Sequence, residues 1–112
     1  MPKVYVSQKP QDRGADTIDI STAAEYGELH YMFPPTTNMR VVSMPLVQAA
    51  RRQLKDYCDD DSILAIGNPV FMAVACAIAA DMNRGRFAVL VWDRLQRTYI
   101  RYRLNTRGLA ND

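Results

Sequence analysis

Arginine and tyrosine occupy every second position near the end of the chain and offer the clearest candidate for chemistry: Arg97, Tyr99, Arg101 and Arg103. On a β-strand, side chains two residues apart project from one face at intervals of about 7 Å. Guanidinium groups pair with phosphate or carboxylate, and a tyrosine between them offers a stacking face. The spacing therefore predicts a face that binds nucleic acid or an acidic protein surface. The alternative is a solvated face that protects an edge strand from pairing.

A second candidate is the turn Gly67-Asn68-Pro69, which joins an apolar segment to the start of a helix. Backbone N–H groups at a helix N-terminus can bind an anion, and here they would lie near Asn68 and Phe71. The turn lacks the second glycine of a dinucleotide fingerprint and the Gly-Lys-Ser/Thr of a phosphate-binding loop, and Pro69 removes one donor. The pattern favours a capped helix start, with an anion site at Asn68 and Phe71 as the alternative.

Carboxylates and metal-binding side chains form no recognisable catalytic pattern. Asp59, Asp60 and Asp61 could bind a hard cation, but adjacent carboxylates rarely converge, and a solvated turn is the preferred interpretation. The single histidine, His30, is expected on the polar face of a strand. Two cysteines cannot complete a zinc site of usual spacing. The sequence therefore predicts no catalytic residues, no metal and no cofactor.

Charge and composition indicate one globular domain with a basic C-terminal part. Of the 112 residues, 48% are hydrophobic and 23% charged. Residues 84–112 contain seven arginines against Asp93 and Asp112, which raises the odds of an anionic partner. The longest apolar run is about 12 residues, short of the ~20 that span a bilayer, so no membrane association is expected. Free thiols at Cys58 and Cys76 suit a reducing cytoplasm.

The elements that position these residues follow from hydrophobic periodicity and turn signals. Residues 28–33 alternate, with Leu29, Tyr31 and Phe33 inward, which predicts a half-buried antiparallel strand with residues 39–43 as its hairpin partner. Residues 8–19 are predicted as a loop, and residues 108–112 as a frayed tail. Thr22 and Glu25 have the spacing of a capping box, and Gly27 can end the short helix. The remaining predicted elements are strands at 3–7, 62–66, 87–92 and 97–104 and helices at 45–57 and 69–83.

The centre of the domain is predicted at residues 69–92. Residues 69–80 have no polar side chain on any helical face, so this helix is expected to be buried, ending with Gly85 as its C′ residue. Residues 87–92 are apolar on both strand faces, so both should be covered. Strand 62–66, helix 69–83 and strand 87–92 predict a parallel β-α-β unit. The fold expected is α+β, with a small mixed sheet of about five or six strands, two main helices and a C-terminal β-hairpin, and not doubly wound.

Four local patterns extend across the chain, from Val4 to Leu104, and resemble those of small proteins encoded by tailed phages, many of them marine. They are Asp19-Ile-Ser21 leading to Glu25-Tyr-Gly27, Ile66-Gly-Asn-Pro69, Ala77-Ile-Ala-Ala80, and Trp92-Asp-Arg94 before Tyr99. The group typically has Gly-Asp-Pro at the position of Gly67-Asn68-Pro69, and since Asn and Asp both cap helices, this favours a capping role. The resemblance implies a small cytoplasmic phage protein and brings no known activity.

Three functions follow from these observations. The leading hypothesis is a non-enzymatic binding or protein-interaction protein that acts in the cytoplasm on a host or phage protein. The first alternative is a nucleic-acid-binding protein that uses the Arg/Tyr face, and the second is a small enzyme or ligand binder at residues 67–71. A homodimer through helix or hairpin surfaces is also open, whereas pairing through strand 97–104 would place like charges opposite each other.

Overall fold

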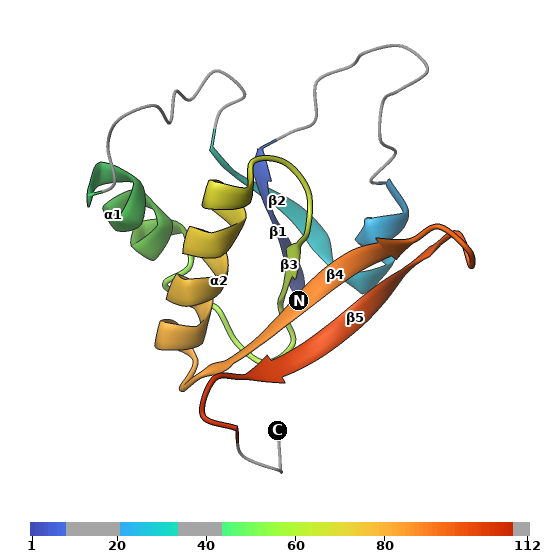
Figure 1. Cartoon of the computed structure of the whole chain (residues 1–112). Helices are drawn as coiled ribbons and strands as arrows, with labels where there is room; N and C mark the ends of the chain where they lie inside the picture. The colour runs from blue at the N-terminus through green and yellow to red at the C-terminus, as the bar shows by residue number, and fades with distance from the viewer. Residues whose placement is uncertain (9–20, 34–43, 109–112) are drawn as a thin grey trace.

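The computed structural model describes residues 1–8, 21–33 and 44–108, which form a five-stranded sheet with helical elements on its two faces (Figure 1). The strand order is β2-β1-β3-β4-β5, in which β2, β1, β3 and β4 run parallel and β5 is antiparallel to β4. In chain order the elements are β1 (Lys3–Gln8), the 3-10 helix η2 (Ser21–Tyr26), β2 (Glu28–Phe33), α1 (Met44–Gln53), β3 (Ser62–Leu64), α2 (Pro69–Met82), β4 (Arg86–Asp93) and β5 (Thr98–Asn105).

The predicted α+β class, the mixed sheet, the two helices and the C-terminal hairpin are confirmed. The antiparallel direction predicted for residues 28–33 is wrong, because β2 pairs in parallel with β1, from Lys3↔Glu28 to Gln8↔Phe33. Alternation shows that one face of a strand is buried, but says nothing about the direction of the neighbouring strand. The predicted hairpin partner 39–43 lies outside the described residues, as do the loop 8–19 beyond Gln8 and the tail beyond Gly108.

Side-chain alternation in β2 also differs from the prediction at its C-terminal end. Met32, predicted outward, is buried, and Tyr31, predicted inward, is exposed. Met32 packs in the same apolar cluster as Leu46 and Ala50 of α1, which therefore covers the face of β2 that was expected to meet water. The more N-terminal Leu29 packs on the opposite face.

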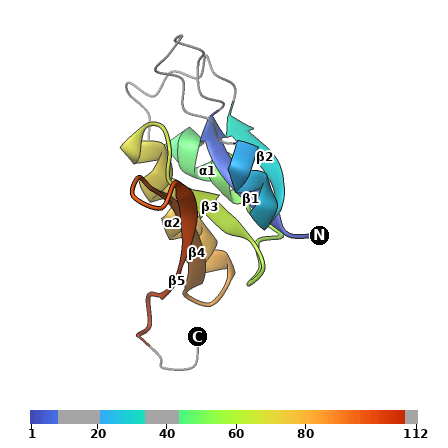
Figure 2. The same cartoon turned by 90° about the vertical axis from the view of Figure 1, so that its right-hand side faces the viewer.

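Two apolar clusters lie on opposite faces of the sheet. Tyr5 and Ile63 point into the larger cluster, beneath α1 and α2. Val4 and Leu64, their neighbours in sequence, point into a smaller cluster that contains Ala23 of η2. Helices α1 and α2 therefore cover one face and η2 part of the other, as Figure 2 shows from the side. Consecutive strand residues face opposite ways, so β1 and β3 are apolar on both faces.

Helix α2 is buried on one side only, which corrects the prediction of a fully enclosed helix. Phe71, Ala75 and Ile78 face the core, whereas Val70 is 55% exposed and Ala73 is also exposed. Ala73 and Ala77 on the exposed side each carry a single methyl group, which loses little by contact with water. The apolar composition of residues 69–80 therefore led to a prediction of more burial than the structure shows. Among the described residues, no helix is long and apolar enough to cross a membrane.

The end of α2 sets the start of β4. Asn83 is the C-cap, Arg84 follows in a left-handed conformation (φ 60°), and the N–H of Gly85 donates to the carbonyl of Ala80 at 2.6 Å. This is a Schellman arrangement in which Arg84, and not the predicted Gly85, is the C′ residue. Gly85 also has a positive φ of 88°, so the chain reverses within two residues and enters β4 at Arg86.

Candidate functional site

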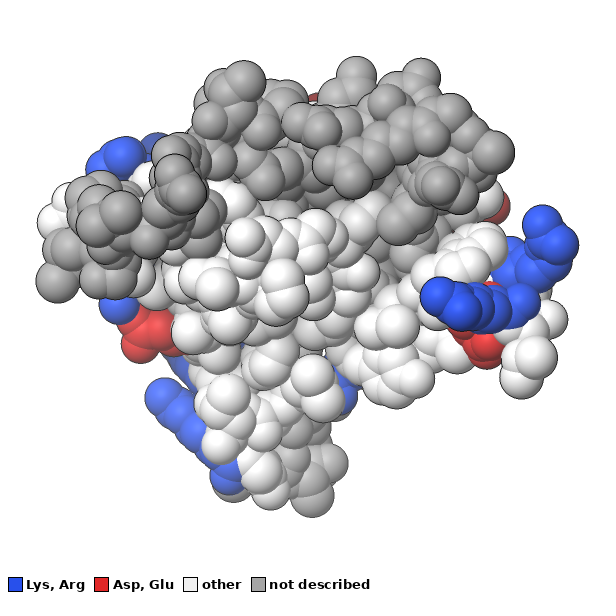
Figure 3. Space-filling model, turned by 45° about the horizontal axis from the view of Figure 1, so that its top comes forward, with Lys and Arg blue, Asp and Glu red and all other residues white. Residues whose placement is uncertain are grey.

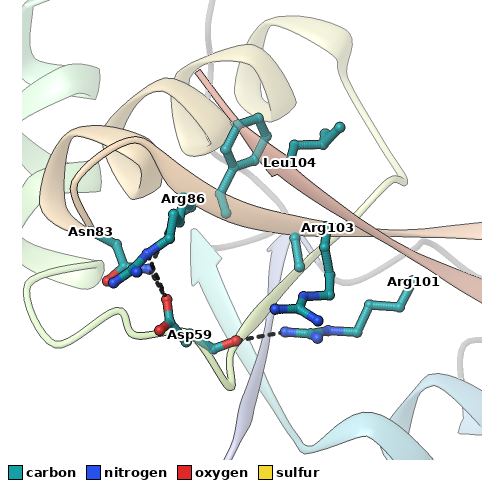
Figure 4. Close-up of a pocket in the computed structure, with 8 residues that line it drawn as sticks. Asp59, Asn83, Arg86, Arg101, Arg103 and Leu104 are labelled. Carbon is teal, nitrogen blue, oxygen red and sulfur yellow. Dashed lines mark hydrogen bonds and ion pairs between the residues drawn. The ribbon is translucent and has the colours of Figure 1, made fainter. Parts of the chain in front are cut away.

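A hollow of about 260 Å³ lies where β4 begins and β5 ends, and arginine side chains dominate its wall (Figure 4). We call it the arginine hollow. Its lining residues come from the turn before β3, the end of α2 and the β4–β5 hairpin: Asp59, Asn83, Arg86, Phe87, Ala88, Arg101, Arg103 and Leu104. Figure 4 shows Arg86 on one side of Asp59 and Arg101 and Arg103 side by side on the other.

Hairpin register brings the three arginines to one face of the sheet. Ala88 lies opposite Arg103, and Leu90 lies opposite Arg101. Arg86, two residues before Ala88, shares their face because alternate strand residues project the same way. Leu90 belongs to the cluster under η2, so this is the face that the two α-helices do not cover.

Arg101 is held in place by neutral oxygen atoms. Its Nε donates to the hydroxyl of Ser62 at 2.8 Å, and its Nη2 donates to the carbonyls of Asp59 at 2.8 Å and Asp61 at 3.1 Å. Hydrogen bonds to carbonyl and hydroxyl groups orient a guanidinium without neutralising its charge. Arg101 therefore joins β5 to β3 and still contributes a positive charge to the wall of the arginine hollow.

The charge of Arg86 is partly balanced by the carboxylate of Asp59. The Arg86 Nε lies 3.2 Å from the Asp59 Oδ1 but lacks the geometry of a hydrogen bond, so this contact is an ion pair only. Asn83 donates from Nδ2 to the same Oδ1 at 2.8 Å and to the carbonyl of Arg86 at 3.1 Å. Both charged side chains are more than one third exposed, and such pairs stabilise little. The lining residues thus include one carboxylate and three guanidinium groups.

The four residues of the predicted Arg/Tyr face do not form one exposed face. Arg97 lies in the turn before β5 with a φ of 54°, and Tyr99 is only 5% exposed. The Tyr99 ring packs edge-on against Trp92 at 5.1 Å, and its carbonyl accepts from the Tyr26 hydroxyl at 3.0 Å. Little of the Tyr99 side chain is therefore accessible from the surface. The structure instead unites Arg101 and Arg103 with Arg86, which the sequence reasoning had not selected.

The three consecutive aspartates diverge. Asp61 is buried, with Oδ1 accepting from the backbone N–H of Lys3 at 2.9 Å and Oδ2 from that of Cys58 at 3.0 Å. Asp59 points into the arginine hollow, and Asp60 is exposed. Asp61 therefore ties the start of β1 to the turn before β3. Within the described ranges, no three His, Cys, Asp or Glu side chains converge as metal ligands would.

At the N-terminus of α2, the predicted helix cap is present. The Asn68 side chain accepts from the Val70 N–H at 2.8 Å, and the Asn68 carbonyl accepts from the Met72 N–H at 3.2 Å. The Phe71 side chain is buried and stacks on Phe33 at 4.9 Å. Binding of an anion at Asn68 and Phe71 stays a prediction. A helix of 14 residues is about 20 Å long, so this position lies far from the arginine hollow at the other end of α2.

Other titratable side chains serve packing. His30, expected on a polar surface, is half-buried, with Nε2 2.8 Å from Gln53 Oε1 and its ring 5.2 Å from that of Tyr5. Burial raises the pKa of Tyr57 to about 12, and its hydroxyl donates to the carbonyl of Asp61 and accepts from the N–H of Ala88. Burial also raises the pKa of the Cys76 thiol, which makes the nucleophilic thiolate scarcer.

The fold and the arginine hollow define a small α+β domain with a cationic recess on one sheet face. The chain belongs to the Phage Pam3 gp32-like protein family, whose sequence profile matches residues 2–106. This confirms the resemblance to small phage proteins. No curated protein and no solved structure matches the chain.

Proposed function

We propose that this phage protein is a non-enzymatic binding protein that holds an anionic group of a partner in the arginine hollow. The observation that carries the proposal is the convergence of Arg86, Arg101 and Arg103 on one recess whose lining contains a single carboxylate, Asp59. Guanidinium groups are the side chains best suited to bind phosphate or carboxylate, because their N–H groups form a rigid planar fork.

The size of the hollow favours one part of a larger partner over a free small molecule. At about 260 Å³ it is below the range of roughly 300–1,000 Å³ that is usual for small-molecule sites. A single phosphate or carboxylate group is small enough for this space. The partner is therefore proposed to be a macromolecule that carries exposed anionic groups.

The chemistry of the lining supports binding over catalysis. Arginine keeps its proton at all ordinary pH values, so it cannot act as a general acid or base. The Asp59 carboxylate is already contacted by Asn83 and Arg86. We further propose that the protein acts in the cytoplasm of the infected host, because the free thiols of Cys58 and Cys76 suit a reducing compartment.

Fluorescence anisotropy with labelled anionic probes tests this proposal. The probes are a polyglutamate peptide, a single-stranded oligonucleotide and a DNA duplex, each titrated with the purified protein. Arg103→Gln removes one exposed cation of the hollow and should weaken binding of the preferred probe about 3- to 10-fold. Arg52→Gln, on the exposed surface of α1, is the matched control and should bind as the parent does. Equal affinity in both variants, or no binding to any probe, would contradict the proposal.

A further inference from the structure

We infer that the projecting end of the β4–β5 hairpin contacts B-form DNA, with Arg94 and Arg97 on the phosphate backbone and Leu95 inside a groove. We call residues 93–97 the hairpin tip. The inference rests on the proposed function in one respect, that the same hairpin presents the arginine hollow to an anionic macromolecule. The features of the tip itself are separate observations.

The hairpin extends beyond the rest of the sheet. Strand β3 pairs with β4 only at Ile63↔Val89 and Leu64↔Leu90. The following pairs of the hairpin, from Val91↔Ile100 to Asp93↔Thr98, continue as a ribbon of two strands. Figure 1 shows this ribbon reaching away from α1 and α2. A two-stranded ribbon is narrow enough to enter the major groove of B-form DNA, which is about 12 Å wide.

The hairpin tip is held in a defined conformation. The Asp93 Oδ1 accepts from the N–H groups of Leu95 at 2.9 Å and Gln96 at 3.4 Å, and the Asp93 carbonyl accepts from the N–H of Arg97 at 2.8 Å. Just behind the tip, Trp92 packs edge-on against the buried Tyr99. A preordered loop loses little conformational entropy on binding, which favours its use as a contact element.

The side chains of the tip combine positive charge with one exposed apolar group. Leu95 is 94% exposed, and Arg94, Gln96 and Arg97 around it are also exposed. Figure 3 shows basic side chains gathered at this end of the molecule around an acidic one. The Asp93 carboxylate is directed to backbone amides by the bonds above. Arginines that flank an apolar side chain match the major groove of DNA, where phosphates line both sides and the methyl group of thymine offers an apolar contact.

The distribution of charge along β5 favours a linear polyanion over a membrane or a compact acidic protein. Arg97 and Arg103 are six residues apart, which corresponds to about 20 Å along a strand. Because β5 is the last strand of the sheet, no further strand of the described residues covers its outer edge, although the Tyr26 hydroxyl bonds to the carbonyl of Tyr99. DNA lying along this edge can reach the hairpin tip and the arginine hollow together. A membrane that meets the tip end-on would reach Arg94 and Arg97 only.

The salt dependence of binding separates the contribution of the hairpin tip from that of the arginine hollow. The probes are a 20-bp DNA duplex, a single strand of the same length, a polyglutamate peptide, and vesicles that contain phosphatidylserine. The tip variants are Arg94→Gln/Arg97→Asn, in which Asn suits the positive φ of residue 97, and Leu95→Gln. The hollow variant is Arg103→Gln. The control of equal charge change, called the α1 control, is Arg52→Gln on α1 with Lys55→Gln in the turn that follows it.

The expected result is tightest binding to the duplex. Each lost phosphate contact reduces the slope of log affinity against log salt by roughly 0.9, so the double tip variant should lose about 1.8 of slope and Arg103→Gln about 0.9. Leu95→Gln should weaken duplex binding about 5- to 30-fold and leave the slope unchanged. The α1 control should lose neither affinity nor slope, and thermal melting should show that every variant is folded.

Three results overturn the inference in distinguishable ways. If Arg103→Gln weakens binding while the tip variants match the α1 control, the tip is not a contact element and the proposed function survives. If the polyglutamate peptide or the vesicles bind more tightly than the duplex, the partner class is wrong. If none of the probes binds, the inference and the proposed function both fail.

Discussion

Replacement of Arg101 by methionine should destabilise the domain far more than the same change at Arg103. Both residues lie on one face of β5 and line the arginine hollow. Arg101, however, donates to the hydroxyl of Ser62 and to the carbonyls of Asp59 and Asp61, and so connects β5 to β3 across β4. Methionine keeps the apolar stem of the side chain and removes only the guanidinium.

The size of the effect follows from the burial of the acceptors. Ser62 is fully buried and Asp61 nearly so, and water cannot readily replace the lost donor there. Hydrogen bonds of charged donors contribute about 1.5–3 kcal/mol each, and the partial exposure of Arg101 places these two near the lower limit. The bond to the exposed Asp59 adds a few tenths of a kcal/mol. We expect Arg101→Met to lower the free energy of unfolding by about 3 kcal/mol and Arg103→Met by less than about 1 kcal/mol.

Urea unfolding, followed by the fluorescence of the single tryptophan and by circular dichroism, measures both variants. With a denaturant dependence of about 1.5 kcal/mol per molar urea, a loss of 3 kcal/mol moves the midpoint down by about 2 M. Ser62→Ala completes a double-mutant cycle with Arg101→Met, and a coupling of about 1 kcal/mol is expected. Equal midpoints for Arg101→Met and Arg103→Met, or the absence of coupling to Ser62, would refute the reasoning.

Three further outcomes are expected. Asn68→Ala removes the cap of α2 and should lower the free energy of unfolding by about 1 kcal/mol, measured by urea unfolding, whereas Asn68→Asp should retain the cap. Gly27→Ala should destabilise by about 2–4 kcal/mol in a thermal melt, because residue 27 has a φ of 152° and an added Cβ would lie 2.6 Å from the carbonyl oxygen of Pro2. Above pH 10 an unfolded chain ionises Tyr57 while the folded chain, with a pKa of about 12, keeps the proton, so the contribution of Tyr57 to stability should fall by about 1.4 kcal/mol per pH unit between pH 10 and 12 and stay constant below pH 10. Tyr5, whose pKa burial also raises to about 12, should add a loss of the same size. Tyr57→Phe should make that alkaline loss smaller, and an unchanged pH dependence would show that another group causes it.

The sequence was sufficient to predict the elements that depend only on residues close to one another along the chain. The Asn68-Pro69 start of α2 and the helix at 45–57, observed as α1, were predicted because caps and helical periodicity depend on residues within a few positions of one another. The direction of β2 was missed because it depends on which edge of β1 is free, and no residue of 28–33 encodes that. The exposed side of α2 was missed for a similar reason, since composition shows which surfaces tolerate burial but not what covers them.

The arginine hollow shows where sequence reasoning stopped short. Arg86 could have been added to Arg101 and Arg103 by pairing the predicted hairpin about its turn, since the register Ala88↔Arg103 is a local consequence of that turn. The position of Asp59 beside these arginines could not be predicted, because it depends on the pairing of β1 with β3 and on the bond from the Lys3 N–H to Asp61. Such contacts join residues nearly 60 positions apart, and local patterns carry no information about them.

Because of this long-range network, the effects of a substitution on stability and on binding can be separated at some residues of the hairpin but not at others. Asp61 ties β1 to the turn before β3, and Arg101 ties that turn to β5, so the wall of the arginine hollow is part of the framework of the domain. A variant at Arg101 would weaken binding by loosening the framework even if the guanidinium never touched the partner. Arg103, Arg94 and Arg97 are exposed side chains of the same hairpin, and polar contacts of exposed side chains contribute little to stability. Substitutions there can therefore distinguish a binding role from a structural one, whereas substitutions at Arg101 cannot.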